Sequence, residues 1–143
     1  MYKGEYSHTI DAKGRVIIPS KLREALGEGF VIARGLEGCL YVYDAEGWKN
    51  FEEKLETMPD ITSVELNALR RFMIAGAVDG ELDKQGRVMI PNSLRTHADL
   101  KKDVVFAGVG KRVEIWDKDR WESALPTDMS EIGAKLESMG LRL

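Results

Sequence analysis

Alternating and continuous runs of apolar residues divide the chain into predicted strands. A strand is predicted at 2–10, where it leads into a polar corner, and an equivalent strand at 78–82 leads into a second corner. Short apolar runs bounded by turn residues predict buried strands at 30–33, 40–43, 104–107 and 113–116. The first two of these buried strands are expected to pair with each other, and so are the last two.

Apolar positions with a helical period predict two helices in the middle of the chain. Asp44 is expected to cap the first helix, Pro59 to end it, and Thr62 or Ser63 to cap the second. Their apolar faces consist of Trp48, Phe51, Leu55 and Met58, and of Leu66, Leu69 and Met73. We interpret these helices as a connector that packs on the core, with partner contact as the weaker alternative.

The C-terminal part is also predicted to be helical. Asp117 would cap a helix that carries Trp121 and Leu125 and is broken by Pro126. A last amphipathic helix begins near Ser130, and its apolar face consists of Met129, Ile132, Leu136 and Met139. Two partners for this face stay open, namely the chain's own core and a neighbouring subunit.

One nine-residue motif occurs twice, at 11–19 and, seventy-two residues later, at 83–91. Further positions repeat after each copy: Leu22 and Leu94, Arg23 and Arg95, Ala33 and Ala107, Val42 and Ile115, Asp44 and Asp117, Trp48 and Trp121. A repeat of this length indicates that the chain is two copies of one module.

The motif predicts a tight hairpin corner with a charged residue beside it. Asp at its first position can cap the turn, and Gly three places later supplies a positive φ. The following Arg starts a strand, and Pro ends that strand and suits the start of a helix, predicted at 20–26 and again at 92–98. Each copy therefore holds a cation on a rigid corner next to a helix start.

Composition limits the possible classes of protein. A chain of 143 residues with 43% hydrophobic residues can bury a core. No apolar run approaches the roughly 20 residues of a membrane span, and Met1 leads directly into a strand pattern, which leaves no room for a signal peptide. Cys39 is the single cysteine, so an internal disulfide is excluded and a reducing cytoplasm is expected.

The net charge of −3 is unevenly distributed along the chain. From Asp11 to Arg23 the balance is +3, because Lys13, Arg15, Lys21 and Arg23 stand against Asp11, and from Asp83 to Arg95 it is +2. From Asp44 to Glu65 seven carboxylates stand against two lysines, a balance of −5. A field segregated in this way directs a polyanion to one face. The alternative is a solvated surface with uneven charge.

The sequence contains no pattern typical of catalysis. His8 and His97 occupy different repeat positions, and no spacing of His, Cys and carboxylates resembles a metal site. Cys39 lies in an apolar stretch that favours a structural thiol. Trp48 and Trp121 share a repeat position, which favours packing over base stacking. We predict no catalytic residue, metal, cofactor or small-molecule substrate.

The paired Asp-x-x-Gly-Arg-Val-x-Ile-Pro motifs resemble the SpoVT-AbrB (swapped-hairpin) DNA-binding fold. Two copies in one chain, with Tyr2-Lys3-Gly4-Glu5-Tyr6 at its start and Ile115-Trp116-Asp117 late in it, resemble the MraZ family of transcriptional regulators. This resemblance implies a non-enzymatic bacterial regulator of the division and cell-wall gene cluster. It would bind repeated promoter boxes in double-stranded DNA as a ring-shaped homo-oligomer, in the cytoplasm and at the nucleoid, without a membrane.

The resemblance also implies an architecture, because each AbrB-type module is half of a barrel completed by a second copy. We predict an α+β fold in which two tandem swapped-hairpin modules form a pseudo-dimeric β-barrel core with peripheral helices. The expected boundaries are 5–47 for the first module, 48–75 for the helical connector, 76–119 for the second module and 120–143 for the C-terminal helical tail.

The predicted DNA-binding residues are Lys13, Arg15, Lys21 and Arg23, with Lys84, Arg87 and Arg95 as a secondary set, and the turns are attributed to Asp11, Gly14, Asp83 and Gly86. Arg15 is the best candidate for reading a guanine edge, and the lysines for phosphate contacts. The second copy has Gln85 in place of Lys13 and Ser93 in place of Lys21, so it is open whether that copy contacts DNA equally or serves mainly assembly.

Three alternatives accompany this prediction. Arg15 and Arg87 could do no more than pair with Asp11 and Asp83 as turn staples. An antitoxin-like or other protein-interaction module on the same fold is the rival function, although antitoxin tails tend to be longer and disordered. An enzyme on a related barrel is the weakest rival. Neither the promoter boxes, nor the ring size, nor repression versus activation follows from the sequence.

Overall fold

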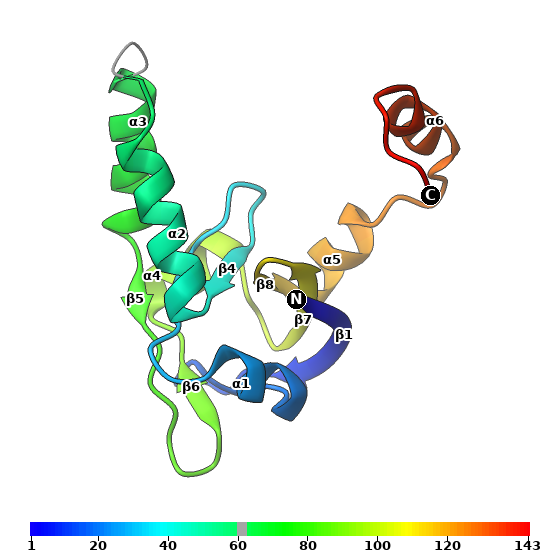
Figure 1. Ribbon diagram of the computed structural model, residues 1–143. Helices are drawn as coiled ribbons and strands as arrows, with labels where there is room; N and C mark the ends of the chain where they lie inside the picture. Colours follow the sequence, from blue (N-terminus) through cyan, green and yellow to red (C-terminus); the bar gives the residue numbers. More distant parts are fainter. Residues whose placement is uncertain (60–62) are drawn as a thin grey trace.

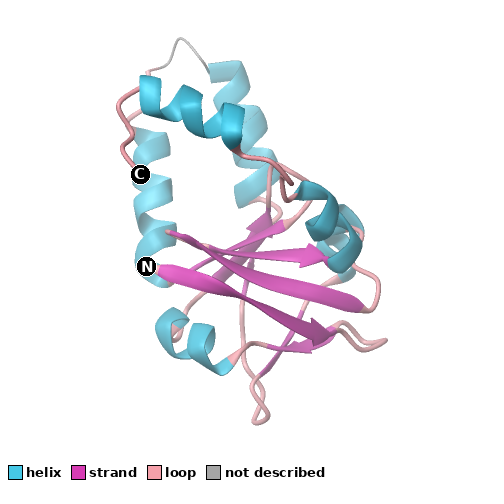
Figure 2. Ribbon diagram, turned by 90° about the vertical axis from the view of Figure 1, so that its right-hand side faces the viewer, coloured by secondary structure: helices cyan, strands magenta, loops and turns pink. Residues whose placement is uncertain are grey.

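The computed structural model describes residues 1–59 and 63–143, and places two β-sheets among surrounding helices (Figures 1 and 2). The strands are β1 (Tyr2–Thr9), β2 (Arg15–Ile17), β3 (Val31–Arg34), β4 (Leu40–Tyr43), β5 (Val78–Asp79), β6 (Arg87–Met89), β7 (Asp103–Gly110) and β8 (Val113–Asp117). The helices are α1 (Ser20–Leu26), α2 (Ala45–Glu56), α3 (Ser63–Leu69), the π-helix η2 (Arg70–Ile74), α4 (Asn92–Ala98), α5 (Lys118–Ala124) and α6 (Ser130–Ser138).

Strands from the two halves of the chain are interleaved within the larger sheet. Its order is β1-β7-β8-β4-β3-β5, with every neighbouring pair antiparallel. The strand that precedes the first corner therefore pairs with β7 of the second half, and the strand that precedes the second corner pairs with β3 of the first half. The smaller sheet joins β2 to β6, one strand from each half. Each half consequently depends on the other for its strand pairing.

The α+β class is confirmed, but the predicted barrel is wrong because the sheet is open. β1 and β5 lie at opposite ends of the six-stranded order and do not pair with each other. The strands β2 and β6, which follow the corners, form a separate two-stranded ribbon, to which Leu82 adds an isolated bridge at Val88. The core is closed instead by helices and by this ribbon packing on the sheet.

Several local predictions are confirmed. The short helices after the corners are α1 and α4, with the predicted bounds. Asp44 caps α2 by accepting a hydrogen bond from the Gly47 N–H at 2.6 Å, and Asp117 caps α5 by accepting one from the Asp119 N–H. The two predicted pairs of buried strands form, as β3 with β4 and β7 with β8.

The strand predicted at 78–82 is wrong in extent, because β5 contains only Val78 and Asp79. Gly80 ends it by passing so close to the ring of Phe30 that a Cβ on Gly80 would overlap the ring. The Gly80 N–H still donates to the Phe30 carbonyl at 2.9 Å, but Leu82 forms an isolated antiparallel bridge with Val88 of β6 instead of pairing with β3.

The main core joins both halves. Val16, Ile18 and Leu22 from the first half pack in one buried cluster with Val88, Ile90 and Leu94 from the same positions of the second half. A second cluster, around Cys39, Tyr41, Met73 and Trp116, lies beneath the helices. Burying this much apolar side chain is the main stabilising contribution to the joint fold.

Helices α2 and α3 run side by side as an arm that projects from the sheets, on the side away from the β6 corner (Figure 1). Leu55, Leu66 and Met73 are buried, in agreement with the predicted apolar faces, whereas Met58 lies beyond the end of α2 and is exposed. The cap predicted at Thr62 falls outside the described residues, and Ser63 is the first residue of α3.

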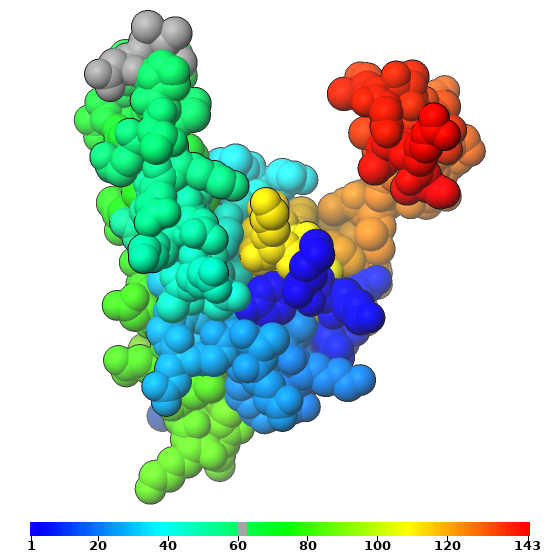
Figure 3. Space-filling view, in the orientation of Figure 1, coloured from blue at the N-terminus to red at the C-terminus, as the bar shows by residue number. Residues whose placement is uncertain are grey.

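Helix α6 forms where it was predicted but buries none of its residues. It forms a separate lobe beyond α5 (Figure 3), and its apolar side chains Met129 and Ile132 are about half exposed. Within the described residues, no helix is long and apolar enough to cross a bilayer.

Candidate nucleic-acid interface

The first corner is held by one carboxylate. Asp11 Oδ1 accepts hydrogen bonds from the backbone N–H groups of Lys13 and Arg15, both at 2.9 Å, and Oδ2 accepts one from Arg15 Nε at 2.7 Å. Gly14 has a φ of 86°, which a residue with a side chain rarely adopts. The backbone hydrogen bond from Arg15 is the main cause that lowers the pKa of Asp11, so the carboxylate keeps its charge and its bonds.

The second corner repeats this geometry. Asp83 Oδ1 accepts from the backbone N–H groups of Gln85 and Arg87 at 2.9 Å, and Oδ2 accepts from Arg87 Nε at 2.8 Å. Gly86 has a φ of 76°. The pKa of Asp83 is lowered, again chiefly by the backbone hydrogen bond from its arginine, here Arg87. The two copies of the motif therefore fold into corners that have the same set of hydrogen bonds.

Pairing of β2 with β6 joins the two corners into one surface. In this ribbon Arg15 lies opposite Met89, and Ile17 lies opposite Arg87. Because side chains alternate along a strand, these four residues share the outer face, while Val16 and Val88 point into the core and are 1% exposed. We call this outer face, made of Arg15, Ile17, Arg87 and Met89, the ribbon face.

The arginines of the ribbon face are oriented and still partly free. Each uses its Nε for the aspartate, and among the described residues nothing bonds the two terminal amino groups of either guanidinium. The Arg15 and Arg87 side chains are 36% and 28% exposed. The pairing of each arginine with its aspartate, one of the alternatives raised by the sequence, thus exists. It leaves both terminal amino groups of each guanidinium able to donate to a pair of acceptors, such as those on the guanine edge.

The other predicted cations fall into two groups. Lys13 is exposed at the first corner, Lys84 is exposed at the second, and Lys21 is exposed on α1. Arg23 and Arg95 are half-buried, and each donates a hydrogen bond inward to a backbone carbonyl, Arg23 to Ile18 and Arg95 to Ile90. The structure therefore places the lysines where they can meet a ligand and turns these two arginines toward the protein.

Sequence reasoning did not include Ile17 and Met89 in the interface. Both are exposed, Ile17 to 43% and Met89 to 61%, although they lie in strands whose neighbouring residues are buried. The signal in the sequence is their position two residues after an arginine in the same strand, which puts them on the same face. An apolar side chain there can contact the methyl group of thymine.

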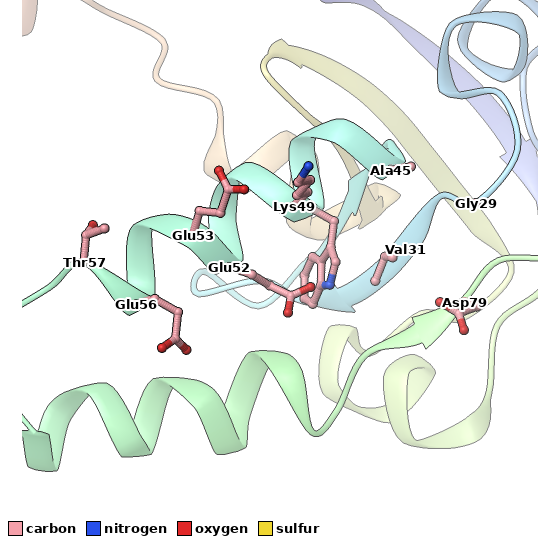
Figure 4. A pocket seen from close by; sticks show the side chains of 10 residues that line it. Gly29, Val31, Ala45, Lys49, Glu52, Glu53, Glu56, Thr57 and Asp79 are labelled. Carbon is pink, nitrogen blue, oxygen red and sulfur yellow. The ribbon is translucent and has the colours of Figure 1, made fainter.

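A hollow of about 790 Å³ is lined by α2 and by residues of β3 and β5, and another helix faces α2 beside it (Figure 4). Glu52 and Glu56 project from α2 toward the facing helix, and Glu53 and Asp79 also line the hollow. Lys49 is its one cation among the described residues. The negative charge of this hollow repels a polyanion, in contrast to the positive charge of the arginines on the ribbon face.

The remaining candidates occupy packed positions. Cys39 is fully buried, and burial is the largest cause that raises the pKa of its thiol to about 12. Trp48 packs against Tyr43 and Phe51, while Trp121 lies beside Trp116 and donates its indole N–H to Glu5 at 2.7 Å. Among the described residues, no three His, Cys or carboxylate side chains cluster as a metal site would require.

The fold and this surface together define a class of protein: a tandem-repeat α+β protein that presents two aspartate-oriented arginines on a β-ribbon. The family described as "MraZ protein, putative antitoxin-like" matches the chain twice, at residues 1–71 and 73–142. The chain belongs to the MraZ family.

Curated relatives match over nearly their whole length. The "Transcriptional regulator MraZ" of Caldanaerobacter subterraneus subsp. tengcongensis is 54% identical over 144 residues, covering 99% of this chain and all of the relative. The protein of the same name from Lachnoclostridium phytofermentans is 52% identical over 141 residues, covering 99% of both chains. The predicted family is confirmed, and these names are those of regulators, in agreement with the expectation of no enzyme.

Proposed function

We propose that this protein is a sequence-specific DNA-binding transcriptional regulator that reads DNA with the ribbon face. The observation that carries the proposal is the pairing of β2 with β6, which sets two partly free, aspartate-oriented guanidinium groups on one exposed ribbon. A two-stranded ribbon fits the major groove, and arginine bonds guanine there through two parallel hydrogen bonds. The regulator names of the relatives support the same function.

The roles of individual residues follow from their positions. Arg15 and Arg87 read base edges, and Lys13, Lys21 and Lys84 contact phosphates. Asp11 and Asp83 close the turns around Gly14 and Gly86 and orient the arginines, because a bare carboxylate facing DNA would be repelled. Arg23 and Arg95 belong to the same surface without facing outward.

The resemblance extends the proposal to assembly and target. The interleaved strands are of the swapped-hairpin type, with modules at 5–47 and 76–119, a helical connector at 48–75 and a tail at 120–143. The protein acts in the cytoplasm, at the nucleoid, as a ring-shaped oligomer. It binds repeated boxes in the promoter of the division and cell-wall gene cluster.

The test is footprinting of the purified protein on the DNA upstream of its own gene. We expect protection of several short, regularly spaced boxes, and no protection of an unrelated fragment of equal length at the same salt concentration. Equal protection of both fragments at physiological salt would contradict sequence-specific binding, because non-specific binding depends only on phosphate contacts.

A second candidate function is that of an antitoxin-like protein-interaction module. It is favoured by the description of the family as antitoxin-like and by the exposed apolar side chains of α6. Affinity purification of the tagged protein that recovers one small protein in a stoichiometric amount would support it. Recovery of DNA and further copies of the chain alone would oppose it.

A further inference from the structure

Arg23 and Arg95 occupy the same repeat position, one on α1 and one on α4, and both turn toward the protein. Arg95 donates from Nε to the carbonyl of Ile90 at 2.9 Å, and Arg23 donates from Nη1 to the carbonyl of Ile18 at 3.4 Å. Both residues are half-buried. Each guanidinium thus uses one nitrogen for a backbone carbonyl of its own half.

Each of these arginines covers the corner that belongs to the other half of the chain. A Cβ placed on Gly14 would lie 2.9 Å from Arg95 Nε and 2.6 Å from the Ile90 carbonyl oxygen. Gly86 is covered in the same way by the guanidinium of Arg23. Only glycine leaves room for an arginine at this distance, so these two glycines serve both the turn and this crossing contact.

Backbone hydrogen bonds also join each corner to the opposite half of the chain. The Ile90 N–H donates to the Gly14 carbonyl at 2.8 Å, and the Ile18 N–H donates to the Gly86 carbonyl at 3.1 Å. Ile90 is thus bonded to Arg95 through its carbonyl and to the first corner through its N–H. Gly14 directly precedes Arg15 in the chain, so a shift of this corner moves the guanidinium that faces the ligand.

We propose that Arg23 and Arg95 are positioning residues for DNA readout, each fixing the corner of the opposite half. Arg95 orients Arg15, and Arg23 orients Arg87. This inference rests on the proposed function and replaces the direct DNA contact expected for the two residues from sequence. A lysine cannot substitute, because its single ammonium lacks the planar group that both covers the glycine and bonds the carbonyl.

The first experiment uses the protein without DNA. Arginine Nε–H resonances are recorded by NMR for the wild type, R95K and R23K, with R15A and R87A to assign the two corner signals. We expect R95K to shift the Arg15 resonance and leave that of Arg87 in place, and R23K to do the reverse. Unchanged corner signals in both variants would overturn the proposal, and so would equal shifts of both signals in each variant.

The second experiment measures binding of upstream DNA across a salt series. Because Lys keeps the charge, R95K should weaken binding roughly tenfold while the dependence on salt stays that of the wild type. Lys13→Ala is the matched control, since loss of a phosphate contact should make the salt dependence less steep. Wild-type affinity of R95K would overturn the positioning role.

A double-mutant cycle tests whether each of these arginines acts on the corner of the opposite half. R95K should be non-additive with R15K and additive with R87K, because only Arg15 lies on the corner that Arg95 covers, and the lysine variants keep enough affinity to be measured. If R95K does not fold, R23K replaces it in every arm, with Arg87 and Arg15 exchanged; its longer hydrogen bond makes its loss less damaging. Absence of wild-type binding would refute the proposed function, whereas the DNA-free spectra would still decide the positioning role.

Discussion

Arg15 and Arg87 have the same partners within their corners but different surroundings. Lys13 at the first corner has Gln85 as its counterpart, Lys84 at the second corner has Ala12 as its counterpart, and Lys21 on α1 has Ser93 as its counterpart on α4. The inward arginine that covers the first corner also makes the shorter hydrogen bond, 2.9 Å for Arg95 against 3.4 Å for Arg23. The shorter hydrogen bond favours Arg15 as the stronger reader of DNA, and the additional Lys21 favours the first half as a whole.

Arg15→Ala is therefore expected to abolish specific DNA binding, and Arg87→Ala to weaken it less. Loss of one bidentate contact to guanine costs about 1–3 kcal/mol, and the first half also supplies Lys21 as an additional phosphate contact. A gel-shift titration of both variants measures this, after each is shown to fold and assemble as the wild type does. Equal losses, or a larger loss for Arg87→Ala, would contradict the unequal roles.

Cys39 provides a test of burial at the residue scale. Burial raises the pKa of its thiol from 9.0 to about 12, so at pH 8 the native protein should hold about a thousandfold less thiolate than an unfolded chain. Alkylation should accordingly be very slow in the native protein and rapid in denaturant. Because the folded pKa is raised, unfolding should also become easier between about pH 9 and 12.

Alkylation of the native protein at a rate similar to that in denaturant would show that the second core cluster opens readily. A mass-spectrometric time course of the intact protein distinguishes the two results, since the chain has only one cysteine.

At the scale of elements, Asp44 links the start of α2 to β1. Its Oδ1 caps the helix through the Gly47 N–H, and its Oδ2 accepts the hydroxyl of Tyr2 at 2.6 Å. Burial, together with this hydrogen bond, raises the pKa of Tyr2, so the hydroxyl stays protonated and continues to donate. One carboxylate thus fixes the arm against the edge strand of the sheet.

Asp44→Ala should destabilise the protein by about 1–2 kcal/mol, because it removes a helix cap and leaves the Tyr2 hydroxyl only its more distant acceptor, the Ala25 carbonyl at 3.2 Å. For a chain of this size that corresponds to a fall in Tm of about 3–8 °C, measured by thermal unfolding followed by circular dichroism. Tyr2→Phe isolates the hydroxyl contribution. Glu46→Ala, in the same helical turn, is the matched control and should change Tm little; an equal effect would contradict the capping role.

At the scale of the whole molecule, the protein has a net negative charge and must still bind DNA, which is also negatively charged. One subunit offers only a few well-placed cations, and release of a few counterions gives weak binding at physiological salt. An oligomer that presents several ribbon faces makes later contacts intramolecular, and avidity can then increase affinity roughly 10²–10⁴-fold. The arm with its carboxylates lies away from the β6 corner and does not oppose this.

DNA with several boxes should therefore bind far more tightly than DNA with one box, and should show a steeper dependence on salt because more phosphates are neutralised together. Fluorescence anisotropy across a salt series compares the two, with fragments of equal length. If one box binds as tightly and with the same slope, the oligomer does not supply the affinity, and a simple dimer-like reader would account for binding.

The sequence alone determined the repeat, the corners and most of the elements. These depend on local rules: an aspartate can cap only its own turn, a glycine allows a positive φ, and proline ends a strand. The helices after the two corners, the caps at Asp44 and Asp117 and the strand pairs within each half therefore agree with the structure. The family followed from the same residues, because the motif is long and occurs twice.

Only the tertiary structure decided how the two halves share their strands and which cations face outward. The open sheet, the short β5 beside Phe30 and the exposed Ile17 and Met89 depend on contacts between residues far apart in the chain. Arg15 and Arg95 are both arginines in repeated positions, and nothing in their local sequence separates them. The half-buried Arg95 meets a corner eighty-one residues earlier in the chain, at Gly14, and that long-range packing, absent from any local pattern, turns it inward.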